Sequence, residues 1–253
     1  MTMRSTTIIA FALVLVGCGG GQQPPTSAAS NLPGQSGAPA TGSAPPVVAG
    51  EPIDTAQVQG AVDALKSQDS WQFEVTTTTL GLDGGVQTVI SGTQTTTPEN
   101  AIDASHPQPG GGDPFRYIRI GDSIWFDVGT GQFNEVQADE AENLIAQYEP
   151  YYLNALAESM TQQDFLFEPV GDETISGIAT THYLLSEEDR ADVTRTLDID
   201  LSKWAGDVWI AKDDGYAMRL AWGPQTIEDA QISLGFNYVV TAVNCECPIE
   251  PPV

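Results

Sequence analysis

Apolar residues along this chain recur with two different periods, and each period predicts a different secondary structure. Over residues 53–67 they stand three and four positions apart behind Asp54, a residue type that favours helix N-caps, so we expect a helix there. Over residues 71–80 the period changes to two, which is typical of a half-buried strand. The Asp-Gly-Gly sequence at residues 83–85 predicts a turn, after which residues 86–97 return as the second strand of a hairpin.

Shorter segments with the same alternation predict further strands. They are residues 115–120, 123–128, 133–136, 165–170, 180–185, 207–212, 216–222 and 230–243. A loop rich in Pro and Gly is expected over 106–114, a hairpin turn at 213–215 and a short helix over 187–197. In the last strand, one face is expected to be apolar without a break, through Ile232, Leu234, Phe236, Tyr238, Val240 and Ala242.

A second helical region is predicted from about residue 139 to residue 160. Its apolar residues form one stripe at helical spacing: Leu144, Ile145, Tyr148, Tyr151, Tyr152, Ala155, Leu156 and Met160. Pro150 interrupts this pattern. Because a proline inside a helix removes a hydrogen bond and clashes with the preceding turn, we expect a kink or two helices that meet near Glu149. The stripe fits ordinary core packing, and it also fits a movable lid over a ligand cavity.

Strands outnumber helices in this prediction, and most consecutive strands are joined by tight turns. This order predicts an α+β fold in which an antiparallel sheet has one wet face and one face covered by helices. A sheet of about ten strands must curl. Helices on its concave face would enclose an apolar space, and we expect one folded domain over residues 51–253.

The N-terminus has the layout of a secretory signal peptide, with Arg4 before an uncharged apolar run from Ile8 to Val16. That run is about half of the roughly 20 residues that a transmembrane anchor needs. The sequence Leu15-Val16-Gly17-Cys18 resembles the bacterial lipobox, in which the cysteine becomes the first mature residue and carries a diacylglyceryl thioether. This resemblance implies that residues 1–17 are removed and that Cys18 is lipidated, with acyl chains such as palmitate. The alternative is an ordinary signal peptide in which Cys18 is incidental.

Composition adds a tether and a strong negative charge. Residues 18–50 follow the predicted leader, are uncharged and consist mainly of Gly, Pro, Ser, Ala, Thr and Gln, so we expect a flexible linker. The chain has 34 Asp and Glu against 9 Lys and Arg, a formal net charge of -25. Such a charge repels nucleic acid and anionic headgroups, so we expect no nucleic-acid partner. We expect the protein to attach to the membrane through acyl chains on Cys18. The expected location is the cell envelope, with the domain on the extracytoplasmic side.

Two cysteines remain near the C-terminus, Cys245 and Cys247. In an exported protein such a pair favours a disulfide. Residues two apart in a strand are separated by about 6.5 to 7 Å, the outer limit for a disulfide, so the pair must lie in a bend. Pro248 is compatible with a bend. A metal or redox role is the alternative, and no histidine is close in sequence.

The sequence offers little catalytic chemistry. His106 and His182 are its only histidines, and we expect a structural or surface role for each. Glycine-rich phosphate loops and zinc-binding histidine motifs are absent from the sequence. We therefore expect no enzyme activity, no cofactor and no metal. The enzymatic alternative would require His106 or His182 to lie within hydrogen-bond distance of both a Ser or Cys and a carboxylate.

The predicted order of elements over residues 53–244 resembles the LppX and LprG lipoproteins of mycobacteria and the related LolA and LolB lipoprotein carriers. The local similarity is carried by Val170-Gly171-Asp172-Glu173-Thr174-Ile175-Ser176-Gly177, by Tyr183-Leu184-Leu185, and by the segments 207–210 and 218–220. The resemblance implies an unclosed half-barrel that binds acyl chains of lipids or lipoproteins and has no catalytic residues. The Cys245-x-Cys247 tail and the acidic surface depart from that family.

These observations predict a membrane-anchored envelope lipoprotein that binds a hydrophobic ligand, lipid acyl chains, for carriage or transfer. The residues expected around the ligand are Leu144, Tyr148, Tyr152, Leu156, Phe126, Ile210 and Phe236. The alternative is a surface interaction protein with a solid core that docks a partner protein. A cavity smaller than about 300 Å³ would favour this alternative, because acyl ligands need more room.

Overall fold

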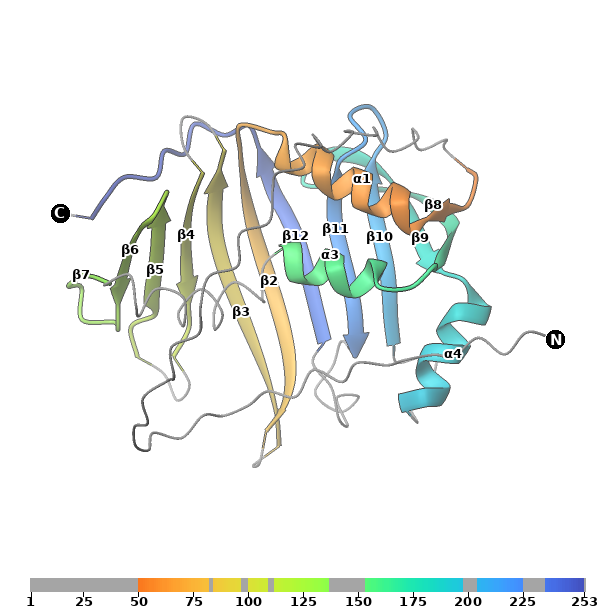
Figure 1. Cartoon of the computed structure of the whole chain (residues 1–253), viewed down its shortest axis with the longest axis horizontal. Helices are drawn as coiled ribbons and strands as arrows, with labels where there is room; N and C mark the ends of the chain where they lie inside the picture. Colours follow the sequence, from red (N-terminus) through yellow and green to blue (C-terminus); the bar gives the residue numbers. More distant parts are fainter. Residues whose placement is uncertain are drawn as a thin grey trace, which may run out of the picture. The chain divides into compact units, whose positions relative to one another are not determined.

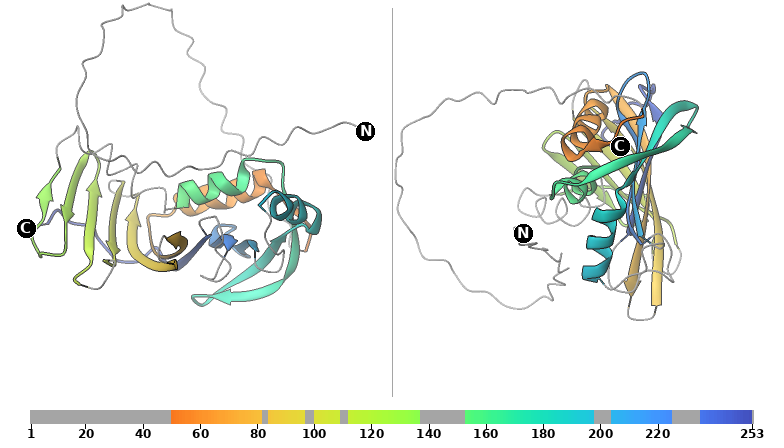
Figure 2. Two further views of the ribbon diagram at one scale, coloured as in Figure 1. Left: turned by 90° about the horizontal axis from the view of Figure 1, so that it is seen from below. Right: turned by 90° about the vertical axis from the view of Figure 1, so that its right-hand side faces the viewer.

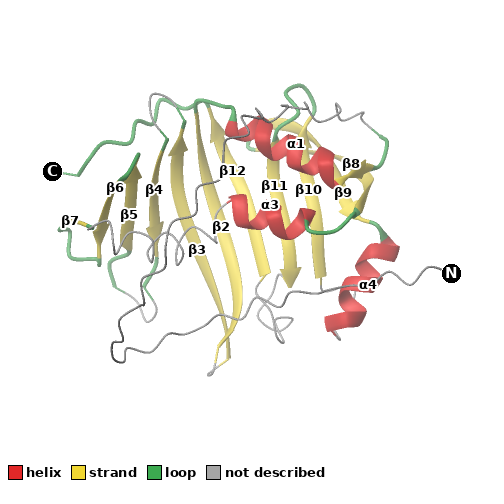
Figure 3. Cartoon of the chain, in the orientation of Figure 1, coloured by secondary structure: helices red, strands yellow, loops and turns green. Residues whose placement is uncertain are grey.

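Twelve antiparallel strands form one sheet in this computed structural model, and three described helices pack with it (Figures 1 and 3). The structure describes residues 50–81, 84–96, 100–108, 112–136, 153–197, 204–224 and 235–252. These residues all belong to one compact unit, residues 42–253. The predicted leader and nearly all of the predicted tether lie outside the described residues.

The first half of the described chain contains β1 (Ile53–Asp54), α1 (Thr55–Lys66), β2 (Ser70–Gly81), β3 (Gly84–Thr95), β4 (Ala101–His106), β5 (Phe115–Ile120), β6 (Ser123–Asp127) and β7 (Asn134–Glu135). The second half contains α3 (Leu153–Thr161), β8 (Leu166–Ile175), β9 (Ile178–Leu185), α4 (Glu187–Leu197), β10 (Trp204–Ala211), β11 (Ala217–Pro224) and β12 (Gly235–Val243).

Across the sheet the strands follow the order β1-β8-β9-β10-β11-β12-β2-β3-β4-β5-β6-β7. Strands β8 to β12 and β2 to β7 are therefore two meanders, and β12 joins them by pairing with β2. The outermost strands, β1 and β7, are two residues long each and do not pair with one another, so the sheet is open. Figure 2 shows the sheet curving around α1 and α3. The α+β half-barrel predicted from the sequence is confirmed.

One face of the sheet, here called the inner face, is turned toward α1 and α3. A row of paired residues defines it: Phe73 of β2 lies opposite Gly92 of β3 and Val240 of β12. The row continues through Ala104 of β4 to Tyr117 of β5. The same buried core includes Val58, Val62 and Leu65 of α1, and Leu153, Leu156, Ala157 and Met160 of α3. The core of the domain thus lies between these two helices and the inner face.

Helix α1 begins where the sequence predicts. The Asp54 carboxylate accepts a hydrogen bond from the backbone N–H of Gln57 at 2.9 Å, and the Gln57 side chain accepts one from the Asp54 N–H at 3.1 Å. This capping box satisfies two N–H groups that the helix itself leaves unpaired. The apolar residues at helical spacing then face the core.

The structure corrects the prediction between residues 83 and 106. Gly84 and Gly85 do not form the turn but belong to β3, where they pair with Gly81 and Leu80. Strand β4 was not predicted, and His106 is the last residue of this strand instead of part of a loop. The reason is composition: the inner-face positions of β4 include one large aliphatic residue, Ile102, so the alternation is weak.

A second correction concerns the last strand. The pairing of β12 with β2 shifts between Val240 and Ala242, so that Val243 instead of Ala242 lies opposite the inner-face residue Trp71. A β-bulge adds one residue and reverses the faces beyond it. The regular alternation predicted through Ala242 therefore ends at Val240, and Val243 takes the next inner-face position. Residues 230–234 lie outside the described chain.

Candidate functional site

The inner face is mostly aromatic or aliphatic. Polar residues also stand on it: Gln94 lies opposite Trp71, Thr77 lies opposite Phe236, and Arg119 lies opposite Ile124. On strands β2 to β6 its buried apolar members are Trp71, Phe73, Val75, Ile90, Ile102, Ala104, Tyr117 and Ile124. On the other half of the sheet they are Ile53, Phe167, Tyr183, Leu185, Val208, Ile210, Leu220, Tyr238 and Val240. Burial of these side chains removes a large apolar area from water.

Not every inner-face aromatic residue is fully buried. Phe115 of β5, Phe126 of β6, Trp222 of β11 and Phe236 of β12 are half-buried. Because their neighbours on the same face are nearly inaccessible, these four rings mark where the inner face still meets accessible space. They come from both halves of the sheet.

The residues predicted to surround a ligand fall into three groups. Phe126 and Phe236 lie on the inner face and are half-buried. Ile210 and Leu156 are each 2% exposed and belong to the packed core. Leu144, Tyr148 and Tyr152 lie outside the described residues. A ligand space bounded by the whole set stays a prediction.

His106 lies among the aromatic residues of β4 to β6. Its ring stacks on Phe115 with centroids 4.6 Å apart, and Phe115 contacts Phe126 with centroids 5.5 Å apart. The side chain is 4% exposed. Burial lowers the pKa of His106 to about 4, so the imidazole is neutral at pH 7 and adds no charge to the inner face.

A second aromatic group lies at the other half of the inner face. Trp222 contacts Phe165 with centroids 5.6 Å apart and Trp204 edge-on with centroids 5.9 Å apart. The indole Nε1 of Trp204 is buried and has no hydrogen-bond partner in the described structure. A buried N–H without an acceptor is unfavourable by about 1 to 3 kcal/mol. This group therefore presents an unused donor at the apolar face.

The second histidine is on the opposite face, here called the outer face. The His182 Nε2 lies 2.7 Å from an Asp207 carboxylate oxygen, and its Nδ1 lies 3.1 Å from a Glu173 carboxylate oxygen. Its ring stacks on Trp209 with centroids 4.2 Å apart. Both ring nitrogens are therefore engaged by carboxylates, and neither is left to activate a Ser or Cys. This arrangement argues against His182 as a catalytic base.

Arg219 completes this outer-face group. Its guanidinium lies 4.3 Å from the Trp209 ring centroid, and its Nε donates a hydrogen bond to the Asn237 side-chain oxygen at 2.8 Å. Burial lowers the pKa of Arg219, while the negative charges of Asp207 and Glu173 oppose that shift. The sequence did not reveal this group, because the position of Glu173 opposite Thr180 depends on a bulge between Pro169 and Gly171.

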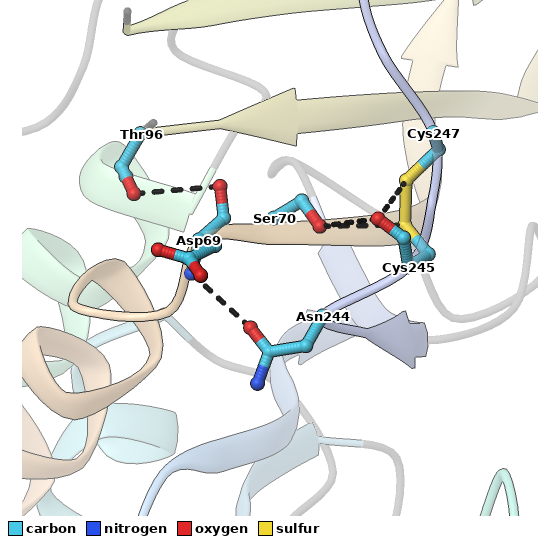
Figure 4. Close-up of a disulfide and its surroundings, with 6 residues drawn as sticks. All are labelled: Asp69, Ser70, Thr96, Asn244, Cys245 and Cys247. Carbon is cyan, nitrogen blue, oxygen red and sulfur yellow. Dashed lines mark hydrogen bonds between the residues drawn. A yellow bond between two sulfur atoms is a disulfide. The ribbon is translucent and has the colours of Figure 1, made fainter. Parts of the chain in front are cut away.

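The two C-terminal cysteines are joined. Cys245 and Cys247 form a disulfide with their Cα atoms 5.3 Å apart, a separation usual for such bonds (Figure 4). The bend that brings them together follows Asn244, whose φ of 52° is in the left-handed region. Both cysteines are half-buried.

Among the described residues, no group of three or more His, Cys, Asp and Glu side chains is arranged to hold a metal ion. None of the described helices is long and apolar enough to cross a membrane.

Comparison with solved structures found several similar folds. The lipoprotein LppX of Mycobacterium tuberculosis is 19% identical, with a TM-score of 0.46 over 78% of this chain and 97% of that chain. LprF of Mycobacterium bovis is 16% identical, with a TM-score of 0.46 over 78% of this chain and 96% of that chain. A LolA superfamily protein of Nitrosomonas europaea is 12% identical, with a TM-score of 0.29 over 76% of this chain and 94% of that chain.

The similar structures thus include LppX, one of the lipoproteins to which the element order was compared, and a member of the LolA superfamily. No family model matches the sequence, and no curated protein matches it.

Proposed function

We propose that this chain is a cell-envelope lipoprotein, anchored through acyl chains on Cys18, whose domain binds the acyl chains of a lipid against the inner face of its sheet for carriage or transfer. The observation that carries this proposal is the inner face itself, which is mostly apolar in both halves of the open sheet and retains half-buried rings in each. Apolar faces with residual access are typical of ligand sites.

Two polar groups near this face are compatible with the same ligand class. His106 is neutral, and Trp204 offers one N–H without an acceptor. An acyl chain requires apolar walls, and the ester or carboxyl oxygen at its end would accept the hydrogen bond that Trp204 lacks. We do not assign a catalytic step, because both nitrogens of His182 are held by carboxylates on the outer face.

Titration of the delipidated protein with a fluorescent fatty acid tests this proposal. Saturable binding is expected. Phe126→Ala should weaken it about tenfold or more, since burying a phenylalanine ring against a ligand is worth about 1.5 to 3 kcal/mol. Val89→Ala is the matched control, because Val89 is on the outer face of β3 and 45% exposed. This variant should bind the fatty acid with the affinity of the unchanged chain.

Absence of saturable binding, or equal losses in Phe126→Ala and Val89→Ala, would refute the proposal. The competing function is a surface interaction protein with a solid core. One observation favours it, namely that Leu156 and Ile210 are packed without accessible surface beyond 2%. A folded domain that binds no fatty acid would support this competing function.

A further inference from the structure

The segment after β12 is fastened to the corner between α1 and β2 (Figure 4). The Asn244 N–H donates to the Ser70 carbonyl at 2.7 Å, and the Asp69 N–H donates to the Asn244 side-chain oxygen at 3.1 Å. The Ser70 hydroxyl donates to the Cys245 carbonyl at 2.9 Å. The two hydrogen bonds of Asn244 therefore hold this segment whatever the state of the disulfide between Cys245 and Cys247, and the Ser70 hydroxyl adds a third while the disulfide is closed.

The disulfide itself restrains very little chain. Its cysteines are two positions apart, so it closes a loop with one residue, Glu246, between them. The stabilisation from a disulfide rises with the length of the loop that it closes. A loop this short removes little freedom from the unfolded chain, and the corner is already held by hydrogen bonds. The bond is poorly suited to a role as a structural staple.

Each sulfur atom also has a neighbour that suits its reduced form. The Ser70 hydroxyl oxygen lies 3.7 Å from the Cys245 sulfur. Its one proton is donated to the Cys245 carbonyl while the disulfide is closed, and a rotation of the hydroxyl turns this proton to a thiolate on Cys245. The Cys247 sulfur lies 3.4 Å from the Cys245 carbonyl oxygen, which can accept from a thiol. Both cysteines are half-buried, so a small thiol can reach them.

We propose that Cys245 and Cys247 form a thiol–disulfide exchange site for low-molecular-weight thiols. A thiolate attacks the Cys247 sulfur, the sulfur–sulfur bond breaks, and its electron pair leaves on Cys245 as a thiolate that Ser70 stabilises. A second thiolate attacks the outer sulfur of the mixed disulfide on Cys247 and releases the Cys247 thiolate. Both protein thiolates take up protons, so the protein disulfide is reduced while two thiols become one disulfide.

The test uses the full chain in mixtures of cysteine and cystine, quenched with acid and alkylated. Tryptic cleavage after Arg219 yields one peptide, residues 220–253, that contains Cys245 and Cys247 but not Cys18. Mass spectrometry of this peptide should show reversible conversion between disulfide and dithiol at millimolar cysteine, with circular dichroism unchanged. Fragment spectra of the quenched intermediate should place the added cysteine on Cys247.

Ser70→Ala should slow the reduction about tenfold, the effect of losing one hydrogen bond to a charged group. Thr96→Val is the matched control, because the Thr96 hydroxyl donates to the Gln68 carbonyl at the same corner without contacting sulfur. Its reduction rate should be unchanged. A disulfide that resists reduction while the protein is folded, loss of the fold on reduction, or cysteine attached to Cys245 would each overturn the proposal. So would a folded Ser70→Ala variant that reacts at the original rate.

Discussion

At the scale of single residues, His106 links the inner face to pH. In the folded protein its pKa is lowered to about 4, whereas 6.5 is its value in an unfolded chain. Between these values the unfolded state binds more protons than the folded state. The contribution of His106 to the free energy of unfolding is therefore fully present above pH 6.5 and falls as the pH is lowered toward 4. At pH 4.5 this single group should have removed about 2 to 3 kcal/mol from the free energy of unfolding.

Because the many carboxylates also titrate in this range, the measurement is a difference between two proteins. His106→Phe keeps a ring that can stack on Phe115 and has no proton to gain. Urea unfolding at pH 7 and pH 4.5 should show that the original chain loses about 2 to 3 kcal/mol more than this variant. Equal losses would show that the burial of His106 does not set its protonation.

Gly92 is a residue whose lack of a side chain is required by packing. A Cβ atom there would lie 2.6 Å from the Phe73 ring and 2.7 Å from the Asp103 carbonyl oxygen. Gly92→Ala should therefore reduce the free energy of unfolding by about 1 to 3 kcal/mol. Gly171→Ala is the control, since a Cβ at Gly171 meets nothing within 4 Å. If chemical denaturation gives both variants the same free energy of unfolding, the claim that Phe73 packs too closely on Gly92 to admit a Cβ atom is contradicted.

At the scale of elements, α3 contains the described part of the predicted apolar stripe, and these residues pack in the core. Leu156 is 2% exposed within the core that α3 shares with α1 and the sheet. Leu156→Ala should lower the free energy of unfolding by about 2 to 5 kcal/mol, as for other tightly packed leucines. Thermal unfolding provides the measurement, with the exposed neighbour Asn154→Ala as a control. A near-native midpoint together with weaker fatty-acid binding would instead make Leu156 part of a lid.

The sequence predicted those elements whose signal is local. Helix α4 has the predicted bounds, Glu187–Leu197, and β5 has the predicted bounds, Phe115–Ile120, because capping residues and turns stand next to a clear period. The hairpin turn at 213–215 is confirmed by the bond from the Gly215 N–H to the Ala211 carbonyl at 2.9 Å. The sequence does not predict strand β4, because its buried residues are small apart from Ile102 and His106, and its pairing with β3 and β5 is not visible in local sequence.

The candidate site was predictable to a smaller extent. Phe126 and Phe236 lie on one face, which follows from alternation within each strand together with the strand registers, and their contact with a ligand stays a prediction. The pairing of His182 with Glu173 and Asp207 was not predictable, because it joins three strands whose register includes a bulge. Burial of His106 was not predictable either, because it depends on the pairing of β4 with β5, which stacks the ring on Phe115.

At the scale of the whole molecule, the net charge of -25 bears on the proposed lipidation of Cys18. The charge repels anionic membranes, so the proposal assigns membrane attachment to acyl chains on this residue. Metabolic labelling with an alkyne-bearing palmitate should mark the original chain and leave Cys18→Ala unlabelled. The double variant Cys245→Ala, Cys247→Ala should keep the label. Label retained in Cys18→Ala would refute lipidation at this residue.

The central claim is that the inner face holds a lipid acyl chain, and native mass spectrometry of the full protein purified in mild detergent tests it most directly. We expect a complex heavier than the covalent chain by the mass of one lipid, which dissociates when the protein is denatured. The covalent anchor on Cys18 remains after denaturation and is thereby distinguished from the ligand. A folded protein with the same mass before and after denaturation, also after incubation with membrane lipids, would contradict the account.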